Sequence, residues 1–311
     1  MKYFDLHCDT LTVCADKGCR LTNCGLQADV DKLNKSGCAA QCFAIFTQGD
    51  CAARDFERYL NFFKSAKKAG EIVQVTNAKQ LKECLEGNAQ AILTVENLGF
   101  TGGNLKEIEK LAAEGVKMAS LVWNYENELA YPNVIFENGL PLFEKREKRG
   151  LKEAGKRVVE KLDELKIIVD ISHLSDGGSE DILKGRKIPA VASHSNAASV
   201  FNVCRNLTDG QIKMLSECGG VAAVNYCYDF IGFENVFEGL LKHVLHIIKV
   251  GGENCVALGS DFDGIPAYPQ LSDCTKVGRL LNYLNMNGIS ADVVEKIAYK
   301  NFLRVFEDVC G

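Results

Sequence analysis

Histidine and carboxylate residues interrupt the first apolar stretch of this chain. The segment "DLHCDT" places His7 and Asp9 two residues apart in what is predicted to be a β-strand. Side chains at positions i and i+2 of a strand point to the same face, so this pair could bind one metal ion. Four more polar residues each follow a different apolar stretch later in the chain, namely Glu96, His173, His194 and Asp261.

These residue types favour a zinc-like divalent ion. Imidazole and carboxylate ligands suit zinc, whereas calcium requires more carboxylates and magnesium rarely takes histidine. Six candidate ligands are more than one tetrahedral ion needs, and a carboxylate can bridge two ions. Two metal ions are therefore the simplest interpretation, provided that the fold brings the six residues together.

Short apolar stretches alternate with longer segments of helical period, which is typical of βα units and a parallel sheet. The helical pattern is clearest over residues 55–70, 151–166 and 235–252. Eight stretches are predicted to be strands: residues 3–9, 39–46, 89–97, 116–124, 167–173, 188–195, 221–227 and 255–264.

Eight βα units favour a (β/α)8 TIM-type barrel, an α/β fold, over an open sheet. The carboxyl ends of the strands in such a barrel meet on one face, so the polar residues at the strand ends are expected to become neighbours. No linker or composition shift divides the chain, and we expect one domain over residues 1–311. The segment 124–149 has no clear period and is expected to be a long βα loop over that face.

Composition limits the classes of partner. The formal net charge is -5 with both signs interleaved, which indicates neither a nucleic acid nor a membrane partner. No secretory signal or membrane span is recognisable, so the sequence predicts a cytoplasmic protein. The fourteen cysteines form no CxxC pair and are expected to be reduced thiols; Cys38 and Cys42 are predicted to share a buried strand face.

Several further polar residues are expected to be structural. Asp5 lies deep in the first strand, and Asp170 points away from His173. Asp263 could exchange roles with Asp261, but Gly264 suggests that a turn has begun there, so we prefer Asp261. The pair His243 and His246 shares one helix face, on a helix expected to lie far from the strand ends.

The chain resembles the membrane dipeptidase (renal dipeptidase) family of zinc peptidases, which are amidohydrolase-like barrels. The matching motifs occur in order from end to end: "DLHCDT", "TVENLGF", "VDISHLS", "ASHSN", "RNLTDGQI", "ALGSDFDG" and the final "NFLRVFEDV". The resemblance implies a zinc-dependent dipeptidase that cleaves the peptide bond of dipeptides with a hydroxide bridging two ions.

The resemblance also implies roles for individual residues. His7 and Asp9 would bind one zinc ion, His173 and His194 the other, and Glu96 would bridge them. Arg205 would bind the carboxylate of the substrate, and Asp261 would transfer protons. Trp123 stands where the family usually has a substrate-binding histidine, and it is expected to contact substrate together with Asn124.

Two departures from the family pattern keep alternatives open. Trp123 in place of histidine, and "ENLG" in place of "EGG" after Glu96, could alter the substrate. The alternatives are a related two-metal amidohydrolase acting on another small amide and a catalytically impaired barrel scaffold. The chain ends without the hydrophobic tail of a lipid-anchored relative, and a homodimer would be unsurprising.

Overall fold

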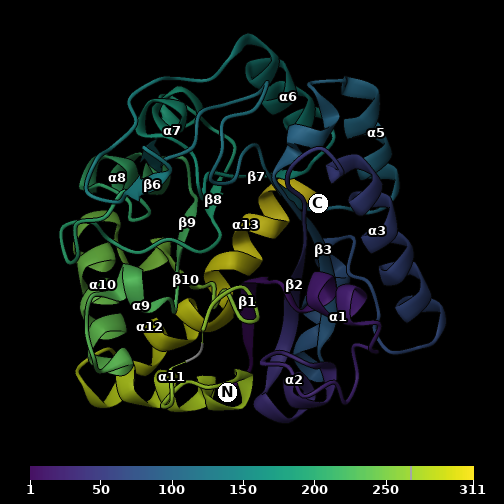
Figure 1. Ribbon diagram of the computed structural model, residues 1–311. Helices are drawn as coiled ribbons and strands as arrows, with labels where there is room; N and C mark the ends of the chain where they lie inside the picture. The colour runs from purple at the N-terminus through teal and green to yellow at the C-terminus, as the bar shows by residue number, and fades with distance from the viewer. Residues whose placement is uncertain (267) are drawn as a thin grey trace.

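Eight parallel strands form the centre of the structure. The computed structural model describes residues 1–266 and 268–311, and its main sheet has the order β1-β2-β3-β4-β7-β8-β9-β10. Asp9 N donates to Phe262 O at 2.9 Å and Asp261 N donates to His7 O at 3.1 Å, which joins β1 to the chain after β10. The predicted (β/α)8 barrel is therefore confirmed (Figure 1).

Each of the eight predicted strand segments overlaps with one barrel strand. The structured part is shorter than predicted in several of them, because the polar residues at the strand ends leave the sheet. The strands are β1 (Tyr3–Cys8), β2 (Cys38–Phe46), β3 (Gln90–Glu96), β4 (Met118–Ser120), β7 (Ile168–Asp170), β8 (Val191–Ala192), β9 (Val221–Val224) and β10 (Val256–Leu258).

Helices cover the outside of the sheet, and the three clearest helical patterns correspond to α3, α6 and α10 (Figure 1). Within the described residues, no helix has the length and apolar character needed to cross a bilayer. The helices are α1 (Thr10–Lys17), α2 (Val30–Ser36), α3 (Ala52–Lys68), α4 (Ala78–Glu83), α5 (Leu105–Ala113), α6 (Glu153–Glu164), α7 (Asp176–Leu183), α8 (Asp209–Glu217), α9 (Tyr228–Ile231), α10 (Val236–Gly251), α11 (Val277–Met286), α12 (Ala291–Glu295) and α13 (Asn301–Cys310).

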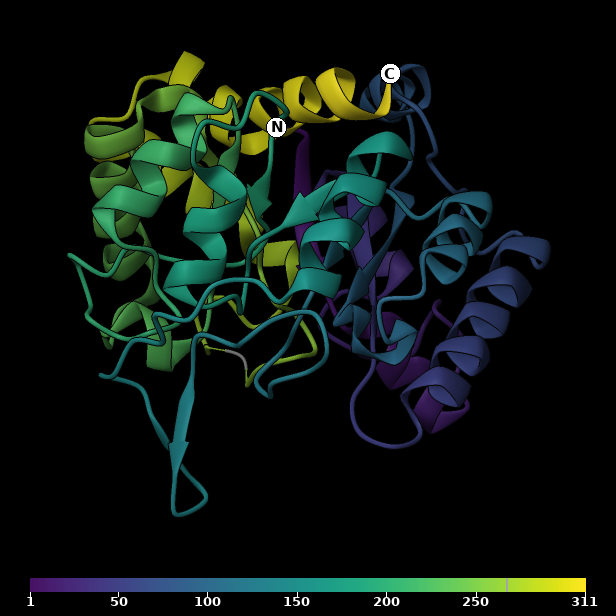
Figure 2. The same cartoon turned by 90° about the horizontal axis from the view of Figure 1, so that it is seen from above.

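Helix α13 closes the end of the barrel at which the strands begin. Its Phe302, Val305 and Phe306 belong to one buried cluster with apolar residues of all eight strands, including Phe4 and Met118. In Figure 2 this helix lies beside both chain termini, on the side opposite the β5–β6 hairpin. The opposite end of the barrel, at which the strands terminate and the polar residues lie, therefore stays accessible.

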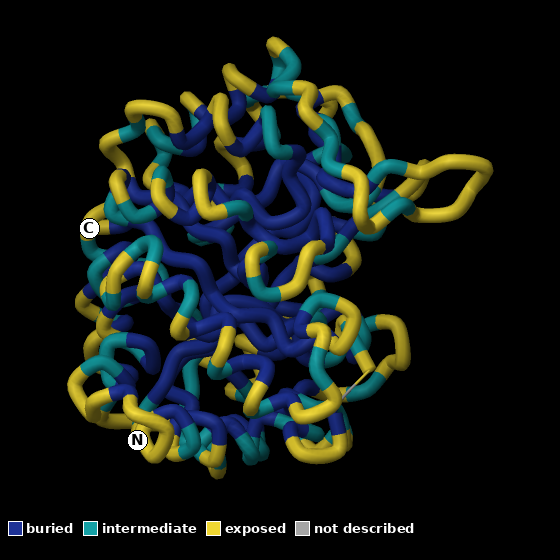
Figure 3. Tube along the Cα trace, turned by 90° about the vertical axis from the view of Figure 1, so that its left-hand side faces the viewer, coloured by how far each residue is buried: buried dark blue, intermediate teal, exposed yellow. Residues whose placement is uncertain are grey.

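The segment 124–149 lies between β4 and α6 and is therefore a long βα loop, as predicted, but it also contains regular structure. It contains an antiparallel hairpin of β5 (Ile135–Glu137) and β6 (Leu140–Leu142), which projects from the body of the molecule (Figures 2 and 3). Asn138 and Gly139 form its turn with φ of 53° and 79°. The Asn-Gly pair is the usual signal of such a turn, but the strands are too short and exposed to show a period.

His243 has a structural role within α10. Its Nδ1 accepts a hydrogen bond from Ala197 N at 3.2 Å, and its Nε2 donates to Ile231 O at 3.1 Å. His246 instead lies 2.7 Å from Asp209 Oδ1 on a more exposed part of the helix. Both nitrogens of His243 are occupied, which agrees with the expectation that this histidine pair is not a metal site.

We predict that His243→Leu destabilises the fold in a pH-dependent way. Burial lowers the pKa of His243 to about 4, below the value of about 6.5 in an unfolded chain. Neutral His243 therefore stabilises the fold above pH 6.5, and this contribution is lost as the pH falls toward 4. Loss of its hydrogen bonds should lower the free energy of unfolding by about 1–3 kcal/mol at pH 7.5.

Urea unfolding at pH 7.5 and near pH 4 measures this effect, with the partly exposed His246→Leu as the control. The stability difference between wild type and His243→Leu should shrink at the lower pH. An equal difference at both pH values would contradict the assigned protonation state.

Candidate active site

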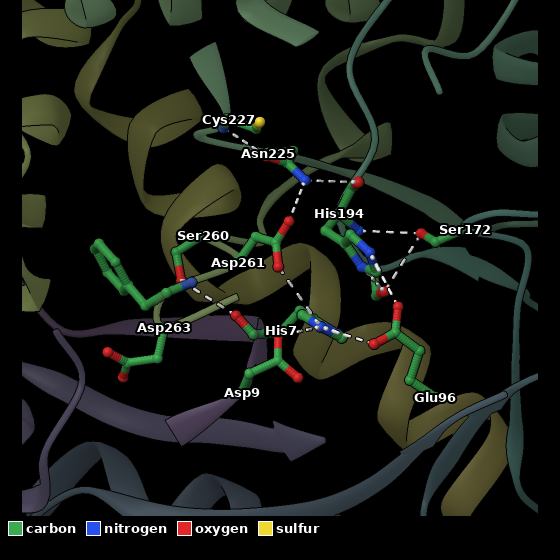
Figure 4. Close-up of polar contacts among 12 residues, drawn as sticks. His7, Asp9, Glu96, Ser172, His194, Asn225, Cys227, Ser260, Asp261 and Asp263 are labelled. Atoms are coloured by element: carbon green, nitrogen blue, oxygen red, sulfur yellow. Dashed lines mark hydrogen bonds and ion pairs between the residues drawn. The ribbon is translucent and has the colours of Figure 1, made fainter. Parts of the chain in front are cut away.

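The six strand-end residues selected from the sequence meet at the open end of the barrel. His7 belongs to β1 and Asp9 follows it, Glu96 ends β3, and the remaining three lie two or three residues beyond β7, β8 and β10, namely His173, His194 and Asp261. Figure 4 shows His7, Asp9, Glu96, His194 and Asp261 pointing toward one another. These residues form three overlapping groups whose ligand atoms lie close enough to hold a metal ion.

The two carboxylate oxygens of Glu96 face different partners. Oε1 lies 3.0 Å from His173 Nε2 and 3.6 Å from His194 Nε2. Oε2 lies 3.7 Å from His7 Nε2, which is 3.6 Å from Asp9 Oδ2. One buried carboxylate therefore separates two pairs of candidate ligands, and each pair has its own Glu96 oxygen.

The hydrogen-bond partners of His173 and His194 fix which nitrogen carries the proton. His173 Nδ1 donates to Asn124 Oδ1 at 2.8 Å. Ser193 Oγ donates to Asp170 Oδ2 at 2.5 Å and therefore accepts from His194 Nδ1 at 2.7 Å. Both Nε2 atoms are then unprotonated, yet they lie 3.0 Å apart. Two nitrogen lone pairs repel at this distance unless a cation lies beside them, so this donor set fits a metal ion.

Burial also keeps these two imidazoles neutral. It lowers the pKa of His173 and His194 well below the usual value, and the positive charge of Arg205 adds to the effect. Neutral imidazole is the form that binds metals. Both histidines are therefore available as ligands at neutral pH.

The other half of the site holds an excess of buried carboxylates. Burial by itself would lower the pKa of His7, but Glu96 and Asp9 raise it to about 10. Burial raises the pKa of Glu96 to about 8 and that of Asp261 to about 6. In addition, His7 Nε2 is buried and has no hydrogen-bond partner in the part of the chain that the structure describes. The group of carboxylates and the unpartnered nitrogen both fit a bound cation.

Asp261 is held by a residue that sequence patterns did not select. Asn225, which directly follows β9, donates from Nδ2 to Asp261 Oδ2 at 2.9 Å and to His194 O at 3.3 Å. The other oxygen, Oδ1, lies 3.9 Å from His7 Nε2. A polar amide within the apolar predicted strand 221–227 was the available signal for Asn225, but its contacts with Asp261 depend on the closed barrel.

Unusual backbone geometry accompanies the site. His173 and Asp261 have φ of 68° and 64°, in the left-handed region that non-glycine residues seldom occupy. A Cβ atom at Gly264 would lie 2.2 Å from Asp9 Oδ2 and 2.6 Å from Asp261 Oδ1, so a larger residue there would displace these carboxylates. Left-handed backbone and a closely packed glycine therefore both accompany the strand-end residues.

A cavity of about 440 Å³ opens onto these residues and reaches Asp9, Glu96, His173 and Asp261. One wall is aromatic: the Trp123 ring packs edge-on against Phe46, with 4.8 Å between the ring centres. Asn124 also lines the cavity, in addition to its contact with His173. The two residues predicted to contact substrate on the fourth strand therefore both face this space.

Arg205 supplies the positive charge of the cavity. Its side chain is buried, with Nη2 donating to His194 O at 3.1 Å and Nη1 to Ser195 Oγ at 3.3 Å. Nε is buried and has no hydrogen-bond partner within residues 1–266 and 268–311. Among the described residues, no carboxylate lies within ion-pair distance of this guanidinium. A buried cation without a counter-ion, facing a cavity, suits an anionic ligand.

The aspartates expected to be structural do have protein partners. Asp5 Oδ1 accepts from Ser260 N at 3.0 Å and from His7 N at 3.2 Å. Asp263 accepts from the backbone N–H groups of Gln27 and Ala28 at 2.8 and 3.2 Å. Their oxygens hold together the chain segments that carry the site, as Asp170 does for Ser193.

Known proteins resemble this chain along its whole length. Residues 1–310 match the family described as membrane dipeptidase (peptidase family M19). An uncharacterised protein of the pqqA 5′ region of Klebsiella pneumoniae is 30% identical over 251 residues, which cover 78% of this chain and 91% of that protein. An uncharacterised dipeptidase of Schizosaccharomyces pombe is 33% identical over 71% of this chain, and the match spans 53% of the yeast protein.

Solved structures agree with the family match. The crystal structure of dipeptidase AC, a metallopeptidase of family M19, superposes with a TM-score of 0.91 at 25% identity and covers 100% of this chain and 99% of its own. A Rhodobacter sphaeroides metallopeptidase has the same fold, with a TM-score of 0.91 at 23% identity and 99% of each chain covered. This chain therefore belongs to the membrane dipeptidase family, peptidase family M19, and is a metallo-dipeptidase.

Proposed function

We propose that this enzyme hydrolyses dipeptides with two zinc ions at the open end of the barrel. His7 and Asp9 would hold one ion and His173 and His194 the other, with the carboxylate of Glu96 shared between the two. The division of the two Glu96 oxygens between two ligand pairs is the observation that carries this proposal. Neutral imidazoles with unprotonated Nε2 atoms support it, because zinc binds such nitrogens well.

The ions, when bound, would supply a hydroxide nucleophile at neutral pH and polarise the scissile carbonyl. Asp261 holds the proton that leaves the attacking water and delivers it to the amine leaving group. Its position supports this role, since Asn225 fixes Oδ2 while Oδ1 faces His7 and the cavity. Burial raises the pKa of Asp261 to about 6, near the pH range in which a general base works well.

Arg205 binds the free carboxylate at the C-terminus of the substrate. The unpartnered buried Nε and the absence of a protein counter-ion among the described residues support this role. Binding that carboxylate inside a cavity of about 440 Å³ limits the substrate to very short peptides. Trp123 and Phe46 form an apolar surface for a substrate side chain.

A second candidate is hydrolysis of another small amide that carries a carboxylate. Trp123 favours it, because an indole cannot replace the acceptor or acid–base chemistry of the histidine that the family usually has at this position. Cytoplasmic location and a homodimer stay predictions from the sequence.

We predict that Glu96→Gln reduces metal content and activity together. A neutral amide cannot bridge two cations, so bound zinc should fall by at least about one equivalent per chain, and kcat/KM on dipeptides by about 100-fold or more. Metal analysis after dialysis measures the first effect. Exposed Glu83→Gln on α4 is the control, and full zinc content in Glu96→Gln would contradict the bridging role.

Amidation of the substrate C-terminus tests Arg205. Loss of a charge-assisted hydrogen-bond pair should lower wild-type kcat/KM by at least about 100-fold, given roughly 1.5–3 kcal/mol for each hydrogen bond to a charged group. Arg205→Met should lose a similar factor on the free-acid dipeptide and show little further loss on the amide. Exposed Arg54→Met is the control; if wild type cleaves both substrates equally well, Arg205 does not bind the carboxylate.

Replacement of Asp261 separates proton transfer from metal binding. Asp261→Asn should keep its zinc and its fold but lower kcat by about 100- to 10,000-fold, the usual contribution of general acid–base catalysis. The comparison variant is Asp263→Asn, which should lose stability rather than kcat because Asp263 binds Gln27 and Ala28. Full activity in metal-loaded Asp261→Asn would remove Asp261 from the mechanism.

A further inference from the structure

Three cysteines form a second group of metal-ligating side chains, apart from the residues at the strand ends. The sulfur atoms of Cys14, Cys19 and Cys24 all lie within 4.8 Å of one another. Cys14 belongs to α1, whereas Cys19 and Cys24 lie in the segment that joins α1 to α2. All three are free thiols.

The backbone of this segment folds so that the three side chains converge. Gly18 ends α1 with φ of 64°, and Cys24 lies between Asn23 and Gly25 with φ of 52° and 73°. Left-handed residues reverse the chain direction, so the turn after α1 and the turn around Cys24 bring all three sulfurs to one side.

Glu71 anchors the middle of the segment. Its Oε2 accepts from Leu21 N and its Oε1 from Arg20 Nε, both at 2.9 Å. Leu21 is fully buried, and its carbonyl accepts from Val30 N at 3.0 Å at the start of α2. The loop that carries Cys19 and Cys24 is thus fixed independently of any bond between the sulfurs.

The thiols have only weak partners within the protein. Cys14, Cys19 and Cys24 each reach a backbone carbonyl, at 3.4, 3.8 and 3.9 Å respectively. Thiols are poor hydrogen-bond donors, so these contacts contribute little. Cys14 is buried, whereas Cys19 and Cys24 are partly exposed, which gives an ion access to the group from solvent.

We propose that Cys14, Cys19 and Cys24 bind one zinc ion through three thiolates, with solvent as the fourth ligand. Zn–S bonds of about 2.3 Å in a tetrahedral site place sulfur atoms about 3.8 Å apart, within the spacing seen here. A disulfide requires a sulfur separation of about 2.05 Å and would leave the third thiol unused. The lack of histidine and carboxylate ligands selects a thiophilic ion over magnesium or calcium.

Binding releases the thiol protons to solvent as each sulfur becomes a ligand. Burial raises the pKa of both Cys14 and Cys24, so without metal they are protonated at neutral pH. Zinc must therefore compete with protons, and the affinity of the site should rise with pH.

This zinc ion would connect α1 to the loop that follows it. Helix α1 supplies Thr12, Val13 and Asp16 to the wall of the substrate cavity. The loop continues to Gln27, whose backbone N donates to Asp263 at 2.8 Å beside the same cavity. The ion is thus placed to make one wall of the cavity rigid without contacting substrate.

Cobalt substitution tests the proposal directly. Co²⁺ bound by thiolates gives an intense sulfur-to-metal charge-transfer absorption in the near ultraviolet, whereas the strand-end site has only nitrogen and oxygen ligands. Reduced wild type loaded with Co²⁺ should show this band, and Cys19→Ser should lose most of it. The matched control is Cys51→Ser, a cysteine that is exposed and outside the group; this variant should keep the band.

Limited proteolysis gives a second readout that does not depend on activity. Lys17 and Arg20 are exposed within the segment, so zinc should slow trypsin cleavage there by about tenfold or more in wild type, because cleavage follows local opening. Cys24→Ala should abolish this protection. The proposal is overturned if wild type shows no thiolate band, if the band persists in Cys19→Ser, or if zinc-saturated protein contains a disulfide within the group. None of these outcomes depends on whether dipeptides are cleaved.

Discussion

Closure of the barrel between β1 and the chain after β10 is the constraint on which the candidate site depends. The backbone hydrogen bonds from Asp261 N to His7 O and from Asp9 N to Phe262 O complete the cylinder. The same bonds fix the main chain of three residues proposed to bind metal or transfer protons. The hydrogen bonds that close the barrel therefore also position these side chains. Asp9 and Asp261 are more than 250 residues apart in the sequence, and they become neighbours only because the barrel closes.

Buried polar partners then orient three of the six strand-end side chains. Asn124 and Ser193 hold the Nδ1 atoms of the two histidines after β7 and β8, which leaves both Nε2 lone pairs toward Glu96. Asn225 does the same for one oxygen of Asp261. Oriented partners of this kind are typical of metal sites, because they fix the tautomer and lower the cost of ordering the ligands.

The arrangement gathers buried carboxylates and imidazole lone pairs that, among the described residues, are only partly compensated. Glu96, Asp9 and Asp261 surround one imidazole that has a buried, unpartnered Nε2. Such a site is unfavourable without a cation, so bound metal should stabilise the folded chain as well as supply chemistry. The unpaired guanidinium of Arg205 is a similar case, in which an anionic substrate would complete the charge balance.

The sequence by itself determined the order of the eight strands, the barrel and the six strand-end residues, because buried parallel strands are continuous apolar stretches in which a polar residue stands out. It could not show which lone pairs face one another, because this depends on partners such as Asn124 and Asn225 that come from other strands. The left-handed backbone at His173, the short exposed hairpin at Asn138 and the convergence of three cysteines leave no periodic signal either. Only the tertiary structure decided them, because they depend on where chain segments meet in space.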